Sequence, residues 1–244
     1  MSFVSTRLGQ FRYFDQQLGS PTWSGKRVLD FGGNCGSLLR DSNATIDEDK
    51  YWCIDVSRDA ILNGKERFPK AHWIFYNRHN VEFNAEGIRA LKIPNTGEEF
   101  DFILAYSVFT HTSKAEMIDM VGQLRTFLTV RGVLAFAFID PQWTAFPGSN
   151  LKWRLHVNRT EHPNMDIDSL LDKSEGAKWL TLVDHKLAVD DEGEYEGEQR
   201  QNPTDDKAYI AFCVPEYMKT IFPEAEIRAP VAPERQHCCV IRRT

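Results

Sequence analysis

The fold of this chain is decided by the stretch Val28-Leu29-Asp30-Phe31-Gly32-Gly33-Asn34-Cys35-Gly36. An apolar run ends here at an acidic residue, and a glycine-rich turn follows at once. This order is typical of a buried parallel strand that leads into a loop whose backbone approaches a ligand closely. The glycines fall in the pattern D-x-G-x-x-x-G, whereas a dinucleotide-binding turn reads G-x-G-x-x-G. The spacing therefore favours a ligand other than a dinucleotide, and a glycine turn without any ligand is the alternative.

Strand-like and helix-like segments alternate from residue 26 to residue 140, as expected of a parallel sheet with helices on both faces. The pattern predicts strands at 26–31, 50–55, 71–76, 100–106 and 132–139. It predicts helices between them at 36–43, 58–67, 84–91 and 113–128. The last helix is the clearest, because Ser113 and Glu116 form a capping box ahead of apolar residues at helical spacing.

Three further segments lie outside this alternation. Residues 1–25 carry apolar side chains in an amphipathic pattern and are predicted to form a helical cap. Residues 141–206 are rich in Pro, Gly and charge and are predicted to be an insertion. Its acidic part, 184–206, is interpreted as a solvated loop or as an attractor of a cationic substrate. After it we predict a helix at about 214–222 and two strands, at 225–231 and 236–242, that pair at a sheet edge.

The composition is that of a globular enzyme of 244 residues with a net charge of −6. Proteins that bind nucleic acids usually carry a basic face, so the acidic balance predicts no nucleic-acid partner. No apolar stretch reaches the length of a membrane span, and the first residues lack the apolar core of a secretory signal. The five cysteines lack framework spacing and are predicted to be reduced thiols. We therefore expect a cytoplasmic protein without membrane contact.

Polar side chains follow the second and third predicted strands. Asp55 ends Tyr51-Trp52-Cys53-Ile54-Asp55, at the carboxyl end of a strand. A carboxylate at this place is able to accept both hydroxyls of a ribose held over the glycine turn. The alternative, a cap for the next helix, is weaker because Ser57 already supplies a cap. The third strand leads into Phe75-Tyr76-Asn77-Arg78-His79-Asn80, where two amides are able to accept or donate hydrogen bonds.

These features follow one another in the order found in the class I S-adenosylmethionine (SAM)-dependent methyltransferases, which this chain resembles. Motif I of that family reads D/E-x-G-x-G-x-G, and here Asn34, the non-glycine type that best tolerates positive φ, replaces the middle glycine. The segment Phe100-Asp101-Phe102-Ile103-Leu104-Ala105-Tyr106-Ser107-Val108-Phe109-Thr110-His111 is similar to motif IV of small-molecule methyltransferases, which opens with F-D and closes with S-V-x-x-H. The resemblance covers roughly 26–140 and, more loosely, 207–242.

The resemblance implies a Rossmann-like α/β fold. We expect a mostly parallel seven-stranded sheet with helices on both faces and an antiparallel strand near the C-terminus. The chain is divided into an N-terminal cap at 1–25 and a methyltransferase domain at 26–244, with a substrate-side insertion at about 141–206.

The resemblance also implies SAM as the cofactor, S-adenosylhomocysteine as the product and no metal. It assigns to the cofactor Asp30, Gly32, Gly33, Asn34, Gly36, Asp55, Val56, Asn77, Arg78, Tyr106 and Ser107. Asp55 is expected to meet the ribose, and the backbone after strand four the methionine end. An amide of Asn77 or Asn80 is expected to meet the adenine, with a bond to its own loop as the alternative.

The absence of several motifs restricts the class of methyl acceptor. Ala105-Tyr106-Ser107-Val108 stands where enzymes that methylate the amino groups of nucleic acids carry D/N-P-P-Y/F. Metal-dependent catechol-type enzymes need an Asp after strand four and an Asp-Asn pair after strand five, and of these only Asp140 is present. No cysteine is placed for covalent methylation of a base. These differences favour a small-molecule acceptor.

Methyl transfer from a sulfonium is an in-line displacement, in which the protein aligns the acceptor and, for a hydroxyl, removes a proton. His111, just past strand four, is the leading candidate for this base, with a surface or helix-capping histidine as the alternative. Histidines interpreted as loop residues are His156, His162 and His185. Aromatic residues interpreted as pocket walls or as core are Trp143, Phe146, Trp153 and Tyr13.

The sequence thus predicts methyl transfer from SAM to an oxygen or nitrogen atom of a small molecule. Two alternatives remain open. One is a methyltransferase of protein or RNA. The other is a SAM-fold protein that acts as a non-methylating catalyst or as a partner subunit.

Overall fold

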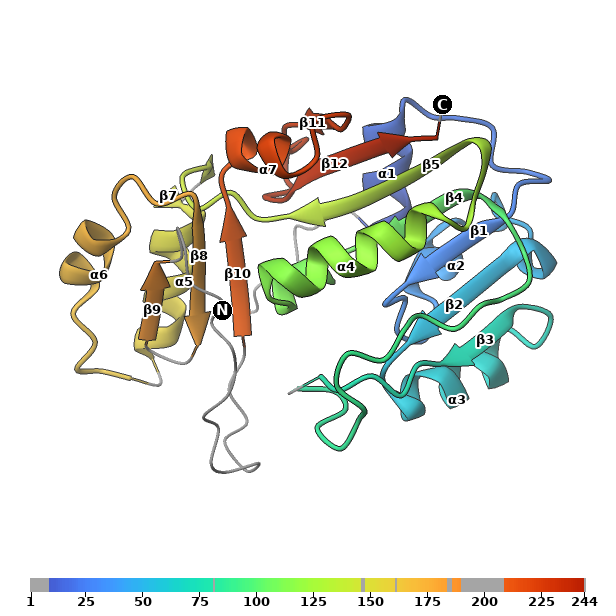
Figure 1. The fold of residues 1–244 in the computed structure, drawn as a ribbon, viewed down its shortest axis with the longest axis horizontal. Coiled ribbons are helices and arrows are strands. Elements are labelled where there is room, and N and C mark those ends of the chain that lie inside the picture. Colours follow the sequence, from blue (N-terminus) through green and yellow to red (C-terminus); the bar gives the residue numbers. More distant parts are fainter. Residues whose placement is uncertain are drawn as a thin grey trace.

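A computed structural model describes residues 9–80, 82–145, 148–160, 162–183, 186–189 and 209–243 of the chain. Its centre is a seven-stranded sheet in the order β11-β12-β5-β4-β1-β2-β3 (Figure 1). The strands are β1 (Val28–Phe31), β2 (Tyr51–Asp55), β3 (His72–Phe75), β4 (Phe100–Ala105), β5 (Leu128–Phe138), β11 (Glu226–Arg228) and β12 (His237–Arg242). Strands β1 to β5 run parallel, and β12 runs antiparallel to both β5 and β11. The predicted fold class is confirmed.

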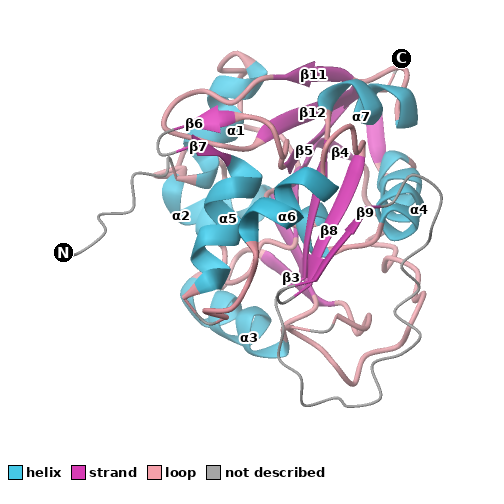
Figure 2. Cartoon of the chain, turned by 90° about the vertical axis from the view of Figure 1, so that its left-hand side faces the viewer, coloured by secondary structure: helices cyan, strands magenta, loops and turns pink. Residues whose placement is uncertain are grey.

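Helices cover both faces of this sheet. They are α1 (Gln10–Leu18), α2 (Ser37–Asp41), α3 (Arg58–Arg67), α4 (Lys114–Arg125) and α7 (Pro215–Ile221), with 3-10 turns η1 (Glu48–Lys50) and η2 (Phe109–His111). Figure 2 shows α1, α2 and α3 on one side of the strands and α4 and α7 on the other. None of the helices in the described ranges has the length and apolar character that crossing a membrane requires.

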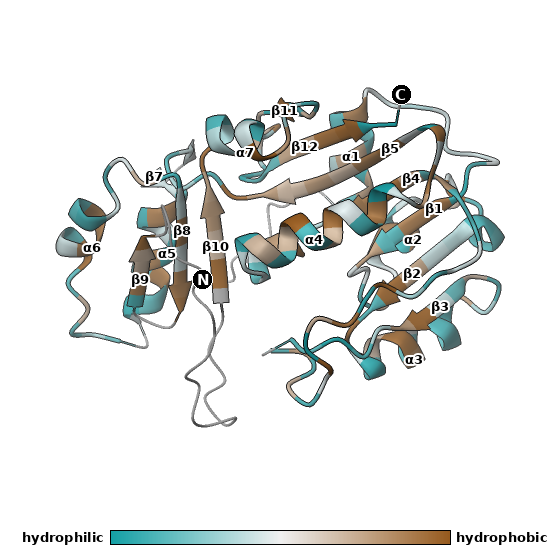
Figure 3. Ribbon diagram, viewed as in Figure 1, coloured by the Kyte–Doolittle hydropathy of each residue, from teal (hydrophilic) through white to brown (hydrophobic). Residues whose placement is uncertain are grey.

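The alternation of side chains along the strands builds the two layers of the core. In β5, Phe136 packs in the core beneath α4, and its neighbour Ala137 packs in the core beneath α1. Because both faces are covered, the strands of the large sheet are apolar along much of their length (Figure 3). The polar residues that end these strands therefore stand out at the edge of the sheet.

A second unit follows β5. It contains β6 (Thr144–Ala145), β7 (Gly148–Ser149), α5 (Asn150–Arg159), α6 (Ile167–Lys173), β8 (Trp179–Val183), β9 (Lys186–Val189) and β10 (Tyr209–Cys213). The last three form an antiparallel sheet in the order β10-β8-β9. Leu155 of α5 and Phe212 of β10 belong to a separate apolar core of this unit. The N–H of Cys213 donates to Ile139 O at 2.9 Å, so the unit is joined to the end of β5.

The seven strands of the main sheet and most of the predicted helices are confirmed, with shifted ends. The helix predicted at 84–91 is wrong. This segment forms turns with two isolated bridges, which join Arg78 to Ile88 and Asn80 to Asn84. A Cβ on Gly87 would lie 2.5 Å from the carbonyl carbon of Arg78, so close packing between backbones overrides the local helical pattern.

The predicted acidic loop lies mostly outside the described residues. Within 184–206 the structure describes only β9, which is a strand rather than a loop. The rest of the predicted insertion is more regular than its composition indicated, because α5, α6 and β8 form within it.

Candidate active site

The loops after β1, β2 and β4 meet at the carboxyl edge of the large sheet. Strand β1 is the shared neighbour, since Asp30 lies opposite Cys53 of β2 and opposite Leu104 of β4. The helices that follow β1 and β4 cover opposite faces of the sheet (Figure 2). In open parallel sheets ligands bind outside the carboxyl ends of the strands at such a switch point. The candidate site therefore lies above the ends of β1 and β4.

The turn after β1 depends on three residues with positive φ. Gly32, Asn34 and Gly36 have φ angles of 73°, 53° and 82°. A Cβ on Gly32 would lie 2.4 Å from Cγ2 of Val108, so this glycine lets the loop after β4 approach closely. Asn34 supports its own conformation, because its Oδ1 accepts a 2.7 Å hydrogen bond from the N–H of Cys35. The replacement of the usual glycine by Asn34 is thus accommodated.

Asp30 lies beneath the turn. It is 1% exposed, and its Oδ2 accepts a 2.6 Å hydrogen bond from the hydroxyl of Tyr51. A Cβ on Gly33 would lie 2.4 Å from the same oxygen, so the carboxyl group packs directly against the turn. Burial raises the pKa of Asp30 to about 7, the bond from Tyr51 lowers it, and the charge of Asp55 raises it. Asp30 therefore supports the turn from the core side.

Asp55 ties the same turn to the helix after β2. Its Oδ2 accepts a 2.8 Å bond from the N–H of Asn34, and its Oδ1 accepts a 2.7 Å bond from the N–H of Ser57. Burial raises the pKa of Asp55, and these backbone bonds lower it. Each oxygen keeps a lone pair, so the carboxylate is able to accept two further donors. Ser57 caps α3 through its own hydroxyl, as predicted.

The amides after β3 bind the loop that follows them. We call residues 79–95 the strap. The Oδ1 atom of Asn77 accepts a 3.1 Å bond from Nδ2 of Asn84. The Oδ1 atom of Asn80 accepts 3.0 Å bonds from the backbone N–H groups of Glu82 and Phe83. Asn80 therefore stabilises a turn of the strap, which is the alternative that the sequence left open for it.

Arg78 anchors the strap to α4. It is 5% exposed, and its guanidinium donates to Leu91 O at 2.8 Å and to Oε1 of Glu116 at 3.2 Å. These hydrogen bonds give the side chain of Arg78 a structural role, because they join the strap to α4. Val56, which is also among the residues that the resemblance assigns to the cofactor, is partly buried against the core beneath α4.

The loop after β4 turns at Ser107, which has a φ of 57°. Its hydroxyl lies 3.2 Å from Oγ1 of Thr110, which in turn donates to Ser107 O at 3.0 Å. The hydroxyl of Tyr106 donates to Oε2 of Glu234 at 2.9 Å, and its ring meets that of Tyr13 edge-on with centroids 5.1 Å apart. The strand-four segment therefore connects the glycine turn with α1 and with the residues before β12.

His111 ends η2 and contacts the strap. Its side chain is 26% exposed, and Nδ1 lies 3.7 Å from Oε2 of Glu82. Its ring is perpendicular to that of Phe83, with centroids 6.5 Å apart. The structure therefore places the candidate base on the strap side of the loop after β4, next to a carboxylate.

The other predicted histidines and aromatic residues are spread over the second unit and α1. His156 is exposed on α5, and His162 follows α5. Trp143 packs edge-on against His237 at 5.2 Å, and Trp153 lies under the guanidinium of Arg235 at 5.0 Å. Phe146 and His185 lie outside the described residues. Within the described ranges, no three His, Cys, Asp or Glu side chains are grouped so as to hold a metal ion.

Sequence reasoning missed a buried group of polar residues beside the end of β5. We call residues 234–237 the polar tetrad. Glu234, Gln236 and His237 are 4%, 6% and 5% exposed. Burial lowers the pKa of His237 to about 4, and the charge of Glu216 raises it, so the imidazole is neutral at pH 7. The signal in the sequence was a run of four polar residues that leads into a terminal strand, and such a run is also typical of an exposed loop.

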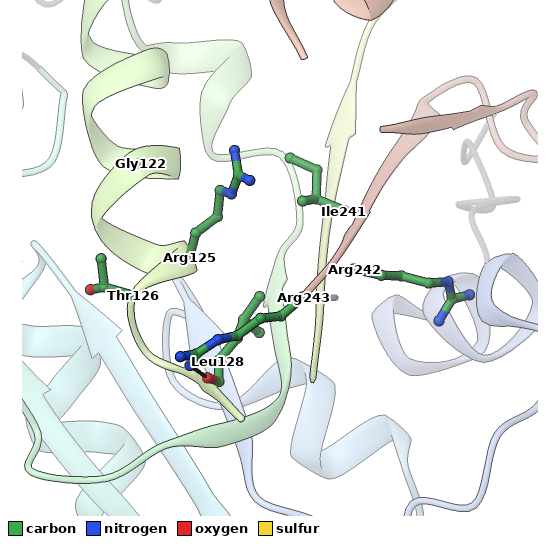
Figure 4. A pocket seen from close by; sticks show the side chains of 7 residues that line it. All are labelled: Gly122, Arg125, Thr126, Leu128, Ile241, Arg242 and Arg243. Carbon is green, nitrogen blue, oxygen red and sulfur yellow. Dashed lines mark hydrogen bonds between the residues drawn. The ribbon is translucent and has the colours of Figure 1, made fainter. Parts of the chain in front are cut away.

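A pocket at the opposite edge of the sheet does not belong to this site. It is lined by Gly122, Arg125, Thr126, Leu128, Ile241, Arg242 and Arg243 (Figure 4). Leu128 begins β5 and Arg242 ends β12, so the pocket lies at the amino ends of the parallel strands. Arg125 pairs with Glu224, and Arg243 pairs with Glu99.

Comparison with known proteins identifies the stretch that carries the site. A family model described as a methyltransferase domain matches residues 29–134. This range runs from β1 into β5 and includes the glycine turn, Asp55 and the loop after β4. The match assigns residues 29–134 of the chain to a methyltransferase domain. The resemblance to methyltransferases that the sequence shows is thus confirmed over these residues.

Solved structures agree with the methyltransferase fold. The pyocyanin biosynthetic protein PhzM matches with a TM-score of 0.54 at 10% identity, over 96% of this chain and 54% of PhzM. CcbJ of Streptomyces caelestis matches with 0.52 at 11% identity, over 96% of this chain and 89% of CcbJ. The glycopeptide N-methyltransferase MtfA matches with 0.54 at 8% identity, over 100% and 92%. The chain spans about half the length of PhzM, and no curated protein sequence matches it significantly.

Proposed function

We propose that this methyltransferase moves the methyl group of SAM to an oxygen or nitrogen atom of a small-molecule acceptor by in-line displacement. The observation that carries the proposal is the convergence of the positive-φ turn, Asp55 and the loop of Ser107 at one point of the carboxyl edge. We further propose that residues 1–25 and the insertion at 141–206 shape the acceptor pocket of a domain that spans 26–244.

In this proposal SAM lies over the turn of residues 32–36. Asp55 accepts the ribose hydroxyls with the lone pairs that its two backbone bonds leave over. The backbone near Tyr106 and Ser107 meets the methionine end. Asp30 and Arg78 act by holding the turn and the strap in place, since both side chains are buried and bonded within the fold.

The adenine is expected beyond the end of β3. Oδ1 of Asn77 accepts from Asn84, so its Nδ2 is proposed to donate to a ring nitrogen of adenine. Val56 is proposed to pack against the ring, because it follows Asp55 and is partly buried.

The transfer requires alignment and, for a hydroxyl acceptor, a base. A sulfonium donor is already activated, so holding the acceptor atom in line with the methyl carbon supplies much of the rate. We propose His111 as the base for a hydroxyl acceptor, because Oε2 of Glu82 lies 3.7 Å from its Nδ1 and is placed to orient the imidazole. An amine that arrives neutral needs no such base.

A small acceptor is supported by the charge of the chain and by the neighbours in fold. The net charge of −6 disfavours a phosphate backbone as partner. PhzM is described as a pyocyanin biosynthetic protein, and MtfA as a glycopeptide N-methyltransferase whose structures hold S-adenosylhomocysteine and SAM. We propose a cytoplasmic enzyme that acts in biosynthesis, without a metal, a nucleic-acid partner or a membrane.

The donor site is tested by titration calorimetry with SAM and with S-adenosylhomocysteine. Asp55→Ala is expected to weaken both by about 10- to 100-fold, because it removes buried bonds worth about 1–3 kcal/mol to the ligand hydroxyls. Asp59→Ala, an exposed acid four residues away on α3, is the matched control and should bind as the intact protein does. No binding by the intact protein would overturn the assignment of the donor site.

The acceptor class is tested by incubating the protein and labelled SAM with an extract of the cells that carry its gene. We expect the label in the small-molecule fraction. Label found chiefly in protein or RNA would contradict the proposed acceptor class and favour the macromolecular alternative.

A further inference from the structure

The polar tetrad, residues 234–237, lies at the carboxyl edge of the sheet beside the loop after β4. His237 is paired with Phe138 at the end of β5, so the tetrad sits at the same carboxyl edge as the glycine turn. Glu234 is reached directly from the end of β4, because its Oε2 accepts the 2.9 Å bond from Tyr106. Tyr106 precedes Ser107, the residue proposed to meet the methionine end of SAM. The tetrad therefore adjoins the loop that is proposed to meet the methionine end of SAM.

The backbone of the tetrad is firmly held. The hydroxyl of Tyr13, from α1, donates to His237 O at 2.8 Å. The Nδ2 atom of Asn150, from α5, donates to Arg235 O at 3.0 Å and to Asp140 O at 2.9 Å. Two separate elements, α1 and α5, thus fix the backbone of this stretch. Its backbone is thus held in one conformation, which favours a precise binding site.

Several side-chain atoms of the tetrad nevertheless lack hydrogen-bond partners. Oε1 of Glu234, Oε1 of Gln236 and Nδ1 of His237 are buried, and none has a hydrogen-bond partner among the described residues. Buried polar atoms are nearly always bonded, so an unbonded group of them indicates a missing partner. Two of these atoms are oxygens that accept hydrogen bonds. The missing partner is therefore rich in hydrogen-bond donors.

The charge of Glu234 further restricts the chemical class of the missing partner. Glu234 forms no ion pair within the described part of the chain, although a buried carboxylate is costly without a cation. The neighbouring guanidinium of Arg235 is stacked on Trp153 instead. The other groups close to Glu234 are the phenols of Tyr13 and Tyr106, which are neutral donors. Among the described residues no cation pairs with Glu234, so a cationic ligand group would balance its charge.

We propose that Glu234 binds a protonated amine or amidine of the methyl acceptor, with Oε1 accepting its N–H and Gln236 and His237 contacting neighbouring polar groups. This inference rests on the proposed function and specifies its acceptor as a cationic small molecule. The bound nitrogen positions the acceptor. The proposal does not require this nitrogen to be the atom that receives the methyl group.

The first experiment separates the acceptor by charge. Small molecules extracted from cells that carry the gene are divided on a cation exchanger at pH 7 into a cationic pool and a pool of neutral and anionic compounds. Each pool is incubated with the intact protein and labelled SAM. We expect the label in the cationic pool. Label only in the other pool would overturn the inference and leave the proposed function standing, whereas label in neither pool would overturn both.

The second experiment uses Glu234→Gln, which removes the charge but keeps the shape and an oxygen for the bond from Tyr106. Labelling of the cationic pool at limiting concentration is expected to fall at least tenfold through a higher KM. The dissociation constant of SAM should stay within twofold of its original value. Glu66→Gln, the same change at an exposed position of α3, should alter neither quantity.

Two results of this experiment would overturn the inference. Undiminished labelling by Glu234→Gln would show that the carboxylate does not bind the acceptor. A tenfold loss of SAM affinity would show that Glu234 serves the donor instead. Glu234→Asp provides a further check, because it restores the charge and is expected to recover part of the lost labelling.

Discussion

The backbone N–H of Asn34 donates a 2.8 Å hydrogen bond to Oδ2 of Asp55, so that one carboxylate fixes the turn after β1. The other oxygen accepts from Ser57. Asp55→Asn is expected to lower the free energy of unfolding by about 1–3 kcal/mol without any ligand, because an amide offers only one oxygen to the two backbone donors. Urea unfolding measures this effect, with Asp59→Asn as the control. Equal midpoints for Asp55→Asn and the original protein would contradict the double anchoring.

Because Asn34 has a positive φ, we expect two small substitutions at this position to differ in their effect on stability. Asn34→Gly is expected to leave the free energy of unfolding within about 0.5 kcal/mol, because glycine adopts a φ of 53° without strain. Asn34→Ala is expected to lower it by roughly 1–2 kcal/mol, the penalty of the left-handed conformation for a residue with a Cβ. Thermal unfolding of the two variants compares them directly. Equal stability of the two would show that the turn does not need this conformation.

Asp30 is expected to make stability depend on pH. Its pKa is about 7 in the folded protein and 3.8 as a free side chain. Between these values the folded protein holds a proton that the unfolded chain has released, so the free energy of unfolding falls as pH rises from about 4 to about 7. The fall attributable to Asp30 is up to about 4 kcal/mol, at 1.36 kcal/mol per pKa unit.

Asp30→Asn isolates this contribution. The amide cannot ionise and still offers an oxygen to the hydroxyl of Tyr51. We expect the variant to gain stability relative to the original protein at pH 8 and to match it at pH 4, in urea unfolding at a series of pH values. Parallel curves for the two proteins would place the pKa of Asp30 near its ordinary value.

The sequence predicted the parts of this site that depend on local chemistry. Glycines that need positive φ, an apolar strand that ends in an acid, and the caps Ser57 and Ser113 are all visible within a few residues. Each of these features constrains the backbone on its own, without help from distant residues. The sequence therefore placed the glycine turn directly after β1 and Asp55 at the end of β2, as the structure has them.

The parts that the sequence did not predict depend on contacts between distant residues. Tyr106 and Glu234 are 128 positions apart, and Tyr13 and His237 are 224 positions apart. No local pattern shows that a polar run such as residues 234–237 is buried by such partners. The strap shows the converse case. Its sequence has a helical pattern at 84–91, but close packing of Gly87 against the backbone of Arg78 prevents a helix there.

Arg78 is expected to hold the strap in its folded conformation. Its guanidinium joins Leu91 O to Glu116 of α4, so Arg78→Ala should lower the free energy of unfolding by about 1–3 kcal/mol through the loss of both hydrogen bonds. Arg78→Lys should lie between the two, because an ammonium cannot reproduce the forked geometry. Chymotrypsin reports on the strap through cleavage after Phe83, which is 49% exposed. We expect cleavage there to accelerate at least tenfold in Arg78→Ala and to stay unchanged in Arg89→Ala, an exposed position of the same strap. Cleavage of Arg78→Ala at the original rate would mean that the strap is held by its other contacts, such as the bond from the hydroxyl of Tyr76 to Leu91 O.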